Sequence, residues 1–343
     1  MTRSSLGFSA HEPVVSVVIP TRNRRHLLLR TLHSVLRQRD VALFVVVVDD
    51  AGTDGSAEAV HRLNDPRVRV VRHRTRAGVS AARNTGIEQV DTTWVAFVDD
   101  DDLWAPDKLR TQLDALGGHP GAQWACTGAA HIDEGCRVLY AAHPPCGPDI
   151  ADLLLGSNIV PGGGSGVVAS TGLARQIGGF DVTLSNLADW DFYIRLGLRS
   201  PVVAVPGPLL GYYVHPGGMA HDIRRSEHDL VRIDAKYADE RQARSIRLDT
   251  AQWLTYLAGL AYNGGHRWGG TRLHLRAACH GRLRSLRSIT AGLLPDRVRA
   301  ARARRILDQI PIDWLQEARA WLATYADDEV WQDSATVPSD VRR

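Results

Sequence analysis

The chain carries four consecutive carboxylates, Asp99–Asp102, directly after the apolar run 94–98. Neighbouring acids repel one another strongly unless some are spread apart or neutralised. Carboxylate oxygens are the ligands that hard cations such as Mg²⁺ and Mn²⁺ prefer. The run therefore indicates a divalent-cation site, with a solvated acidic turn ahead of a helix as the alternative.

A second apolar run also ends in acids. The segment 45–48 is followed by Asp49 and Asp50, and then by a glycine-rich turn that contains Asp54. An aspartate at a strand end can accept hydrogen bonds from a nucleobase edge or from ribose hydroxyls. Turn formation and helix N-capping explain Asp54 and the glycines, but they explain the paired acids less well.

The acids lie at the ends of segments in a chain whose hydrophobic pattern alternates between that of a strand and that of a helix. Short apolar runs rich in β-branched residues alternate with helical patterns, which is typical of βαβ units and a parallel sheet. The predicted strands are 14–19, 43–48, 68–71 and 94–98, and the predicted helices between them are 23–38, 56–63 and 79–89. Ligands of an open α/β sheet bind outside the carboxyl ends of its strands. Both acidic segments fall at that edge.

The pattern loosens after about residue 120. Further strands are predicted at 167–170, 202–205 and 209–214, with a helix over 187–198. Helical stretches follow near 226–260, 271–290, 296–308 and 312–325, where Pro295 and Pro311 suit helix N-termini. Trp253, Tyr256, Leu257 and Leu260 have helical spacing, which indicates core packing. We predict an α/β domain over 1–222 and a helical C-terminal domain over 223–343.

Composition limits the class of protein. A length of 343 residues fits about two domains, and 44% hydrophobic with 23% charged residues is typical of a soluble globular chain. The net charge of +3 excludes a strongly polycationic or polyanionic protein. Between Arg267 and Arg305 there are eleven arginines and one acid, Asp296. Such helices can lie on an anionic membrane or meet an acidic partner; a solvated face with coding bias is the alternative.

The expected location is the cytoplasm. The four cysteines include no C-x-x-C pair, so we interpret them as reduced thiols. The first fifteen residues lack the apolar core of a signal peptide. No apolar run approaches the roughly 20 residues that span a bilayer. Association with a membrane surface stays open.

Four segments together resemble family 2 glycosyltransferases in order and spacing. They are IPTRNR at 19–24, VDD at 48–50 with GTDGS after it, GVSAARNTG at 78–86 and FVDDDDLW at 97–104. The resemblance covers about residues 14–218. It implies a GT-A-like nucleotide-diphospho-sugar transferase domain, with a mostly parallel sheet flanked by helices. It also implies inverting, metal-assisted transfer of a sugar from a nucleotide diphosphate sugar, most plausibly a UDP- or dTDP-sugar, to an acceptor nucleophile.

The resemblance also implies roles for individual residues. The family's acidic motif is Asp-x-Asp-Asp, and x is here itself an aspartate, Asp100. The implied metal is Mn²⁺ or Mg²⁺, held by Asp101, Asp102 and His215. The implied nucleotide-sugar-binding residues are Pro20, Thr21, Asn23, Asp49, Asp50, Arg83, Asp99 and Asp100.

The same resemblance implies a catalytic base. In the family a Glu-Asp pair before an aromatic residue follows a Gly-Gly-Phe-Asp turn, which is here 178–181. The Glu position is Ala188, and the Asp position is kept as Asp189. We predict that Asp189 removes the acceptor proton, with Asp191 as the second candidate. Acids favoured by the helix dipole are the alternative.

The acceptor side is implied by a small-residue loop. Gly163, Gly164 and Ser165 resemble the loop that lines this side, and Trp190 either packs in the core or stacks on a sugar. The acceptor stays undetermined among a natural product, a peptide, a lipid-linked intermediate and a polysaccharide. Oligomeric state is equally undetermined.

Two other functions fit the sequence less well. A sugar-nucleotidyltransferase would need a glycine-rich loop directly after the first strand. The segment at this place begins with Pro20 and Thr21 and contains no glycine. A non-catalytic protein that binds nucleic acid or a membrane surface through the arginine-rich helices leaves the acidic strand ends unexplained. We therefore predict no nucleic-acid partner.

Overall fold

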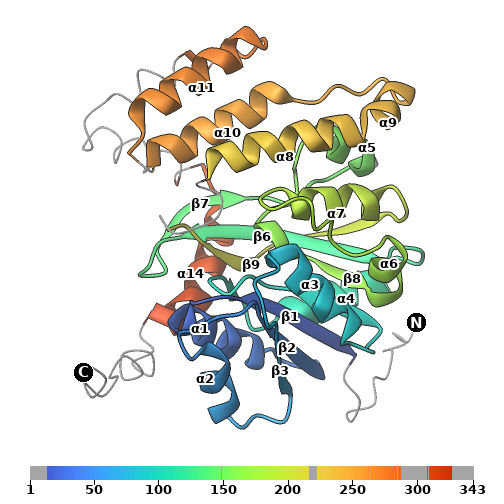
Figure 1. The fold of residues 1–343 in the computed structure, drawn as a ribbon, viewed down its shortest axis with the longest axis vertical. Helices are drawn as coiled ribbons and strands as arrows, with labels where there is room; N and C mark the ends of the chain where they lie inside the picture. The colour runs from blue at the N-terminus through green and yellow to red at the C-terminus, as the bar shows by residue number, and fades with distance from the viewer. Residues whose placement is uncertain are drawn as a thin grey trace.

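The structure is a computed structural model that describes residues 14–147, 149–215, 222–263, 265–283, 285–286, 307 and 309–326. A central mixed sheet has helices on both faces, and a layer of helices covers one end (Figure 1). Pro295 lies outside the described residues, as does nearly all of the predicted helix over 296–308.

The first half of the sheet is parallel, as predicted. Its four strands lie in the order β3-β2-β1-β4 and pair in parallel. The strands are β1 (Val15–Thr21), β2 (Leu43–Asp49), β3 (Val68–Arg72) and β4 (Trp94–Phe97). The helices that connect them are α1 (Arg25–Leu36), α2 (Ser56–Arg62) and α3 (Val79–Glu88). Their carboxyl ends therefore meet at one edge.

The second half of the sheet is mixed. Its strands are β5 (Leu103–Trp104), β6 (Trp124–Ile132), β7 (Val138–Ala142), β8 (Val168–Ser170) and β9 (Val202–Tyr213). Strand β8 runs antiparallel to β4 and β6, and β9 runs parallel to β6. The two strands predicted at 202–205 and 209–214 are one strand, β9. Its register to β6 shifts where Thr127 pairs with Val205 and Gly128 with Pro208, which leaves Pro206 and Gly207 as a bulge.

The remaining helices follow the predicted pattern in shorter pieces. They are α4 (Lys108–Gly117), α5 (Ile150–Gly156), α6 (Thr171–Gln176), α7 (Ala188–Gly197), α8 (Ile223–Lys236), α9 (Ala238–Ala243), α10 (Thr250–Asn263), α11 (Arg267–Cys279) and α14 (Ile312–Ala326). A single 3₁₀ turn, η1 (Gly163–Gly166), precedes β8. The predicted helices near 226–260 and 271–290 thus correspond to α8 to α10 and to α11.

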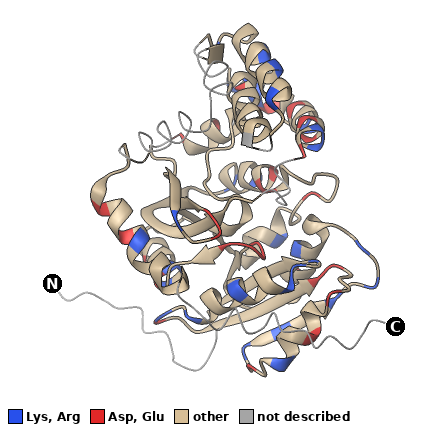
Figure 2. Cartoon of the chain, turned by 90° about the vertical axis from the view of Figure 1, so that its left-hand side faces the viewer, with Lys and Arg blue, Asp and Glu red and all other residues tan. Residues whose placement is uncertain are grey.

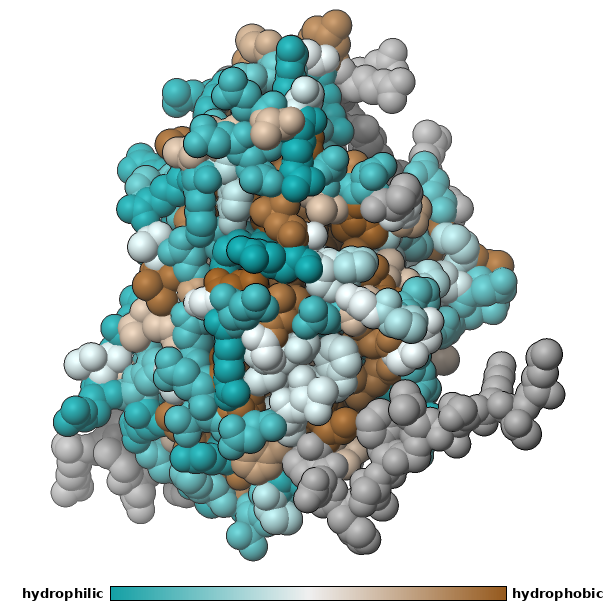
Figure 3. All heavy atoms as spheres, turned by 90° about the vertical axis from the view of Figure 1, so that its right-hand side faces the viewer, coloured by the Kyte–Doolittle hydropathy of each residue, from teal (hydrophilic) through white to brown (hydrophobic). Residues whose placement is uncertain are grey.

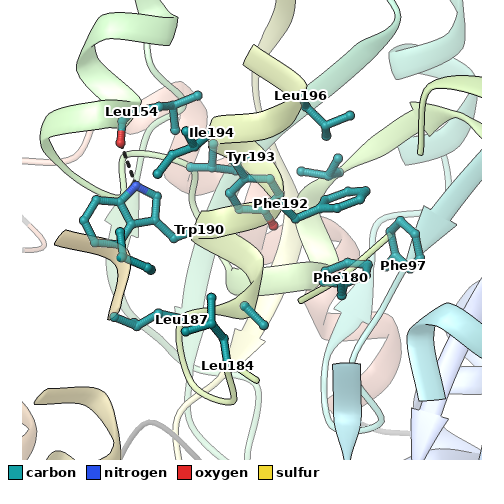
Figure 4. Packing of buried hydrophobic residues seen from close by; sticks show 14 of the residues in the cluster. Phe97, Leu154, Phe180, Leu184, Leu187, Trp190, Phe192, Tyr193, Ile194 and Leu196 are labelled. Atoms are coloured by element: carbon teal, nitrogen blue, oxygen red, sulfur yellow. Dashed lines mark hydrogen bonds between the residues drawn. The ribbon is translucent and has the colours of Figure 1, made fainter. Parts of the chain in front are cut away.

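Both faces of the sheet are buried. Because successive strand residues point to opposite faces, Val18 and Phe97 join one core cluster while Val17 and Ala96 join the other. Phe97 packs edge-on against Phe180 and Phe192, which stack on each other at 4.2 Å (Figure 4). This packing fixes α7 on the same face as α3.

The helices after residue 222 share this core. Leu230 of α8 and Leu257 of α10 belong to the cluster that contains Phe97. Helix α14 instead packs on the far end of the sheet, where Trp321 Nε1 donates to Pro208 O at 2.8 Å. The predicted boundary at 222/223 stays a prediction, and the apolar core is continuous across it.

The face of the molecule drawn in Figure 3 is mostly hydrophilic. Figure 3 shows one face on which polar residues surround smaller apolar patches. Among the described residues, none of the helices combines the length and the apolar character that crossing a bilayer requires.

Helix α3 lies so close to β1 that it needs a glycine at the contact. A methyl group at Gly86 would overlap the Val18 side chain. We expect Gly86→Ala to lower the free energy of unfolding by about 1–3 kcal/mol, the usual cost of overpacking a core. Gly118→Ala is the control, because its new methyl would lie 3.5 Å from Ala115 O. Urea unfolding measures both, and equal stability of the two variants would contradict this contact.

Candidate active site

The acidic strand ends meet in one cavity. Thr21 at the end of β1 pairs with Asp49 at the end of β2, and Asp99–Asp102 follow β4, the other neighbour of β1. Figure 2 shows acidic segments in the middle of the molecule with basic segments beside them. A cavity of about 570 Å³ lies over these ends. Its lining includes the predicted residues Pro20, Thr21, Asp50, Arg83, Asp99, Asp100, Asp101, Gly163, Gly164, Asp189 and His215.

Two of the four adjacent aspartates share a cation. Asp100 accepts from Thr21 Oγ1 at 2.7 Å and from Arg24 Nη1 at 3.1 Å. Asp101 Oδ2 lies 2.5 Å from the same Arg24 nitrogen and 2.9 Å from His215 Nε2. Burial, together with the neighbouring charge of Asp101, raises the pKa of Asp100 to about 7. The pair therefore carries more negative charge than Arg24 alone compensates.

Asp102 has a different place from the one predicted. Its side chain is completely buried, and it accepts from Ser165 Oγ at 2.5 Å and from the Tyr213 backbone N–H at 2.9 Å. Burial raises its pKa well above the ordinary value. Ser165 is buried too, and its Oγ also accepts from the Asp99 N–H at 2.9 Å. Neither residue lines the cavity; together they fasten the acidic loop to η1 and β9.

Asp99 is paired with Arg83. The Arg83 guanidinium is 3% exposed, donates to Asp99 Oδ1 and lies 5.0 Å from the centre of the Phe180 ring. A Cβ at Gly164 would lie 2.6 Å from Arg83 Nη2. The missing side chain at 164 therefore lets this cation reach the cavity.

Asp189 lies where the two sides of the cavity meet. A methyl group built on Gly163 would lie 3.5 Å from Asp189 Oδ2, 3.9 Å from Asp99 Oδ2 and 3.9 Å from Tyr212 Cε2. Burial raises the pKa of Asp189 to about 6, although the nearby Arg83 lowers it. A carboxylate with such a pKa can exchange a proton near neutral pH.

The structure does not bring Asp191 or Trp190 to the cavity. Asp191 is fully buried, and its carboxylate lies 2.6 Å from Arg195, 2.7 Å from Lys236 and 2.7 Å from the Tyr237 hydroxyl. Trp190 is also fully buried, and its Nε1 donates to Leu154 O at 2.7 Å (Figure 4). Both residues hold α7 in the core, so Trp190 is a packing residue and cannot stack on a sugar.

The two acids at the end of β2, Asp49 and Asp50, have different roles. Asp50 lines the cavity and accepts from the N–H groups of Ala77 and Gly78 at 2.7 and 2.8 Å and from His73 Nδ1. Burial opposes ionisation of Asp50, but these donors hold its pKa below the ordinary value.

Asp49 and Asn23 do not line the cavity. Asp49 Oδ1 accepts from the Gly52 N–H at 2.7 Å, and Asn23 Oδ1 accepts from the Thr53 N–H at 2.6 Å. Both side chains therefore shape the turn that carries Asp50.

Sequence reasoning missed several cavity residues, among them Arg24, Tyr212 and Tyr256. Arg24 lies within the first motif, but no pattern in the motif marked it as the cation shared by Asp100 and Asp101. Tyr212 reaches the cavity from β9 and Tyr256 from α10. Tyr256 was predicted to pack in the core, yet it is 47% exposed. Only the juxtaposition of distant segments reveals these positions.

The donor set suits a divalent cation in part. Asp101 and His215 offer an oxygen and a nitrogen that lie 2.9 Å apart on the cavity wall, and the excess negative charge beside them would be relieved by a cation. Across the described parts of the chain, no three acidic, His or Cys side chains converge as a complete metal site. Further ligands would have to come from a bound phosphate or from water.

The two acids of α7 can be separated experimentally. Asp191→Asn leaves Arg195 and Lys236 without their buried partner, so we expect a loss of about 3 kcal/mol in the free energy of unfolding. Turnover per folded molecule should stay near that of the unchanged protein, because Asp191 does not reach the cavity. Thermal unfolding measures the loss of stability, and an assay at fixed substrate concentration measures the turnover. Unchanged stability with strongly reduced turnover would contradict it.

Comparison with known proteins agrees with this geometry. Residues 16–139 match the family described as Glycosyl transferase family 2. The putative teichuronic acid biosynthesis glycosyltransferase TuaG of Bacillus subtilis is 38% identical over 107 residues, which is 31% of this chain and 42% of that protein. The putative colanic acid biosynthesis glycosyl transferase WcaA of Escherichia coli is 28% identical over 194 residues, 54% of this chain and 67% of that protein. The chain thus spans less than half of TuaG and about two thirds of WcaA.

Solved structures show the fold. The mannosyltransferase PcManGT from Pyrobaculum calidifontis, solved with GDP-Man and Mn²⁺, superposes with a TM-score of 0.53 at 21% identity, over 94% of this chain and 88% of that one. TarS 1–349 of S. aureus with UDP-GlcNAc gives a TM-score of 0.51 at 19% identity, over 93% and 92%. The motifs, the mixed sheet and the family match lead to one assignment. Residues 16–139 form a glycosyl transferase family 2 domain, and the chain has the GT-A fold.

Proposed function

We propose that this chain is an inverting glycosyltransferase that moves a sugar from a nucleoside diphosphate sugar to an acceptor hydroxyl or other nucleophile. The observation that carries the proposal is the meeting of Asp189, Asp99 and Tyr212 over Gly163. At this point a carboxylate able to accept a proton lies beside the acidic strand ends that suit a nucleotide. A nucleotidyltransferase or a non-catalytic binding protein would not need that arrangement.

The donor would lie along the ends of β1, β2 and β4. Asp50 is held in place by backbone donors and can accept from the base or the ribose. The Asp99 carboxylate, fixed by Arg83, can accept from ribose hydroxyls. Pro20 and Thr21 form the wall between these two acids. The complex of a fold relative with GDP-Man supports this class of donor.

Asp101 and His215 would hold Mn²⁺ or Mg²⁺ in this arrangement. When bound, such an ion neutralises the charge that develops on a diphosphate leaving group. Arg24 lies between Asp100 and Asp101, so its guanidinium would add positive charge beside the bound ion.

Asp189 would take the proton from the acceptor. Its position at the start of α7 aims Oδ2 at the space over Gly163, where an acceptor hydroxyl would meet the sugar carbon. The bond between that oxygen and the carbon forms as the bond to the diphosphate breaks on the opposite side, which inverts the configuration. The electron pair leaves with the nucleoside diphosphate.

Replacing the base tests the proposal. Asp189→Asn keeps the shape but cannot accept the proton, so we expect kcat to fall at least about a hundredfold, the scale of general-base catalysis. Donor binding should persist. Asp114→Asn on the exposed face of α4 is the matched control and should leave kcat unchanged. The assay is release of nucleoside diphosphate, and near-normal turnover of Asp189→Asn would exclude Asp189 as the base.

The pKa of Asp189 predicts how the activity depends on pH. Only the deprotonated carboxylate can act as base, and the pKa of Asp189 is raised to about 6. Activity should therefore be full above that pH and fall about tenfold for each pH unit below it. A rate that stays constant down to pH values near the ordinary pKa of aspartate would contradict this assignment.

Asp101→Ala tests the cation site. We expect this variant to lose the strengthening of nucleoside diphosphate binding by Mn²⁺, because the carboxylate that would hold the ion is gone. Calorimetric titration with and without Mn²⁺ measures the effect, and Asp114→Asn again serves as control. Undiminished strengthening in Asp101→Ala would mean that another group holds the ion.

A further inference from the structure

The cavity continues beyond Asp189 into a second part that differs in chemistry from the donor side. Its walls come from β6, β7 and β9 on one side and from α10 on the other. Figure 1 shows α10 above the end of the sheet that β7 and β6 form. The side chains that matter here are His131, Tyr140, Tyr212, Trp253, Tyr256 and Leu260. We call this part the aromatic slot.

The sheet wall of the slot carries three rings in contact with one another. His131 of β6 pairs in register with Tyr140 of β7 and with Tyr212 of β9. Directly paired residues project from the same face of a sheet. The His131 ring stacks on Tyr140 at 4.0 Å with an interplanar angle of 17°, and it lies 4.8 Å from Tyr212. Three neighbouring strands thus bring three rings together, with His131 and Tyr140 face to face and Tyr212 tilted by 53° to His131.

The helix wall is apolar as well. Trp253, Tyr256 and Leu260 follow at spacings of three and four residues, so they share one side of α10. Tyr256 is 47% exposed and Tyr140 is 37% exposed, although both line a cavity. Their exposed ring area therefore faces a space that a ligand could fill.

The slot has no charged side chain to hold a phosphate. Among the described cavity residues between 131 and 162 and between 252 and 260, none is Asp, Glu, Lys or Arg. Burial lowers the pKa of His131 to about 3, so its ring is neutral. A diphosphate placed here would lose its hydration without gaining a cation, which is costly.

Three polar atoms in the wall lack a partner. His131 Nδ1, Asn158 Oδ1 and Trp253 Nε1 are buried and have no hydrogen-bond partner within the described residues. Buried polar atoms are normally paired. His131, Asn158 and Trp253 all line the cavity, so a bound molecule with hydroxyl or carbonyl groups would find polar side chains in an otherwise apolar wall.

We propose that the acceptor is an uncharged, hydroxyl-bearing compound with an aromatic ring, which lies in the aromatic slot and directs one hydroxyl at Asp189. This inference rests on the proposed function and names its acceptor class. Asp189 takes the proton of that hydroxyl, the oxygen bonds to the sugar carbon, and the diphosphate departs with the electron pair. A lipid-linked diphosphate sugar is the acceptor class that the slot disfavours.

Binding of simple probes tests the acceptor class without knowledge of the natural acceptor. A hydroxycoumarin and a hydroxylated flavone should bind the full chain, as measured by calorimetry. Tyr140→Ala and Tyr256→Ala should each weaken that binding about tenfold, the scale of one lost stacking contact. Both side chains are partly exposed, so these variants should fold. Trp268→Ala, at an 85% exposed position on α11 outside the cavity, is the control and should bind like the unchanged protein.

A second probe and a second readout separate the possible failures. Trp253→Phe keeps most of the ring but removes the unpaired N–H, so it should weaken binding of hydroxylated rings while leaving nucleoside diphosphate binding unchanged. A decyl diphosphate sugar should bind more weakly than the flat phenols.

Tighter binding of the diphosphate lipid, or flat-phenol binding that is indifferent to Tyr140→Ala and Tyr256→Ala, would overturn the inference. If the unchanged protein does not bind a nucleoside diphosphate at all, the proposed function is overturned instead.

Discussion

Four adjacent carboxylates at the end of one buried strand are the constraint on which the site depends. Their partners are Arg83 for Asp99, Thr21 for Asp100, His215 for Asp101, and Ser165 with the Tyr213 N–H for Asp102, while Arg24 is shared by Asp100 and Asp101. This division spreads the negative charge over two walls of the cavity. The glycines at 163 and 164 are the counterpart, because a larger side chain there would displace Arg83 or fill the space beside Asp189.

The aromatic core fixes the positions of these groups relative to one another. Phe97, at the end of β4, packs on Phe180 and Phe192, so the strand that precedes the acids and the helix that carries Asp189 share one cluster. Arg83 lies over the Phe180 ring of that cluster. A change in packing there would move the cation, the acidic loop and the predicted base together.

The parts predicted from sequence are those with local signals. Strands β1, β2 and β4 are short apolar runs, and Asp189 follows a recognisable turn. Asp191 could not be separated from Asp189 in this way, because its partners Lys236 and Tyr237 lie some 45 residues later in the chain. Residues two apart on a helix point in nearly opposite directions, and only the packed structure tells which direction leads to the cavity.

The aromatic slot was hidden for the same reason. Tyr256 and Leu260 have the spacing of core residues, yet α10 covers the end of the sheet and leaves a space there. His131, Tyr140 and Tyr212 come from three strands whose register a single sequence does not determine. Long-range packing thus produced the part of the cavity that we propose for the acceptor.

The most direct test of the central claim is calorimetric titration of the chain with UDP, dTDP, GDP, ADP and CMP, each with and without Mn²⁺. A transferase that uses a nucleoside diphosphate sugar should bind one diphosphate tightly and bind it more tightly with Mn²⁺. Absence of binding to every nucleotide in both conditions would contradict the claim that the acidic strand ends form a donor site.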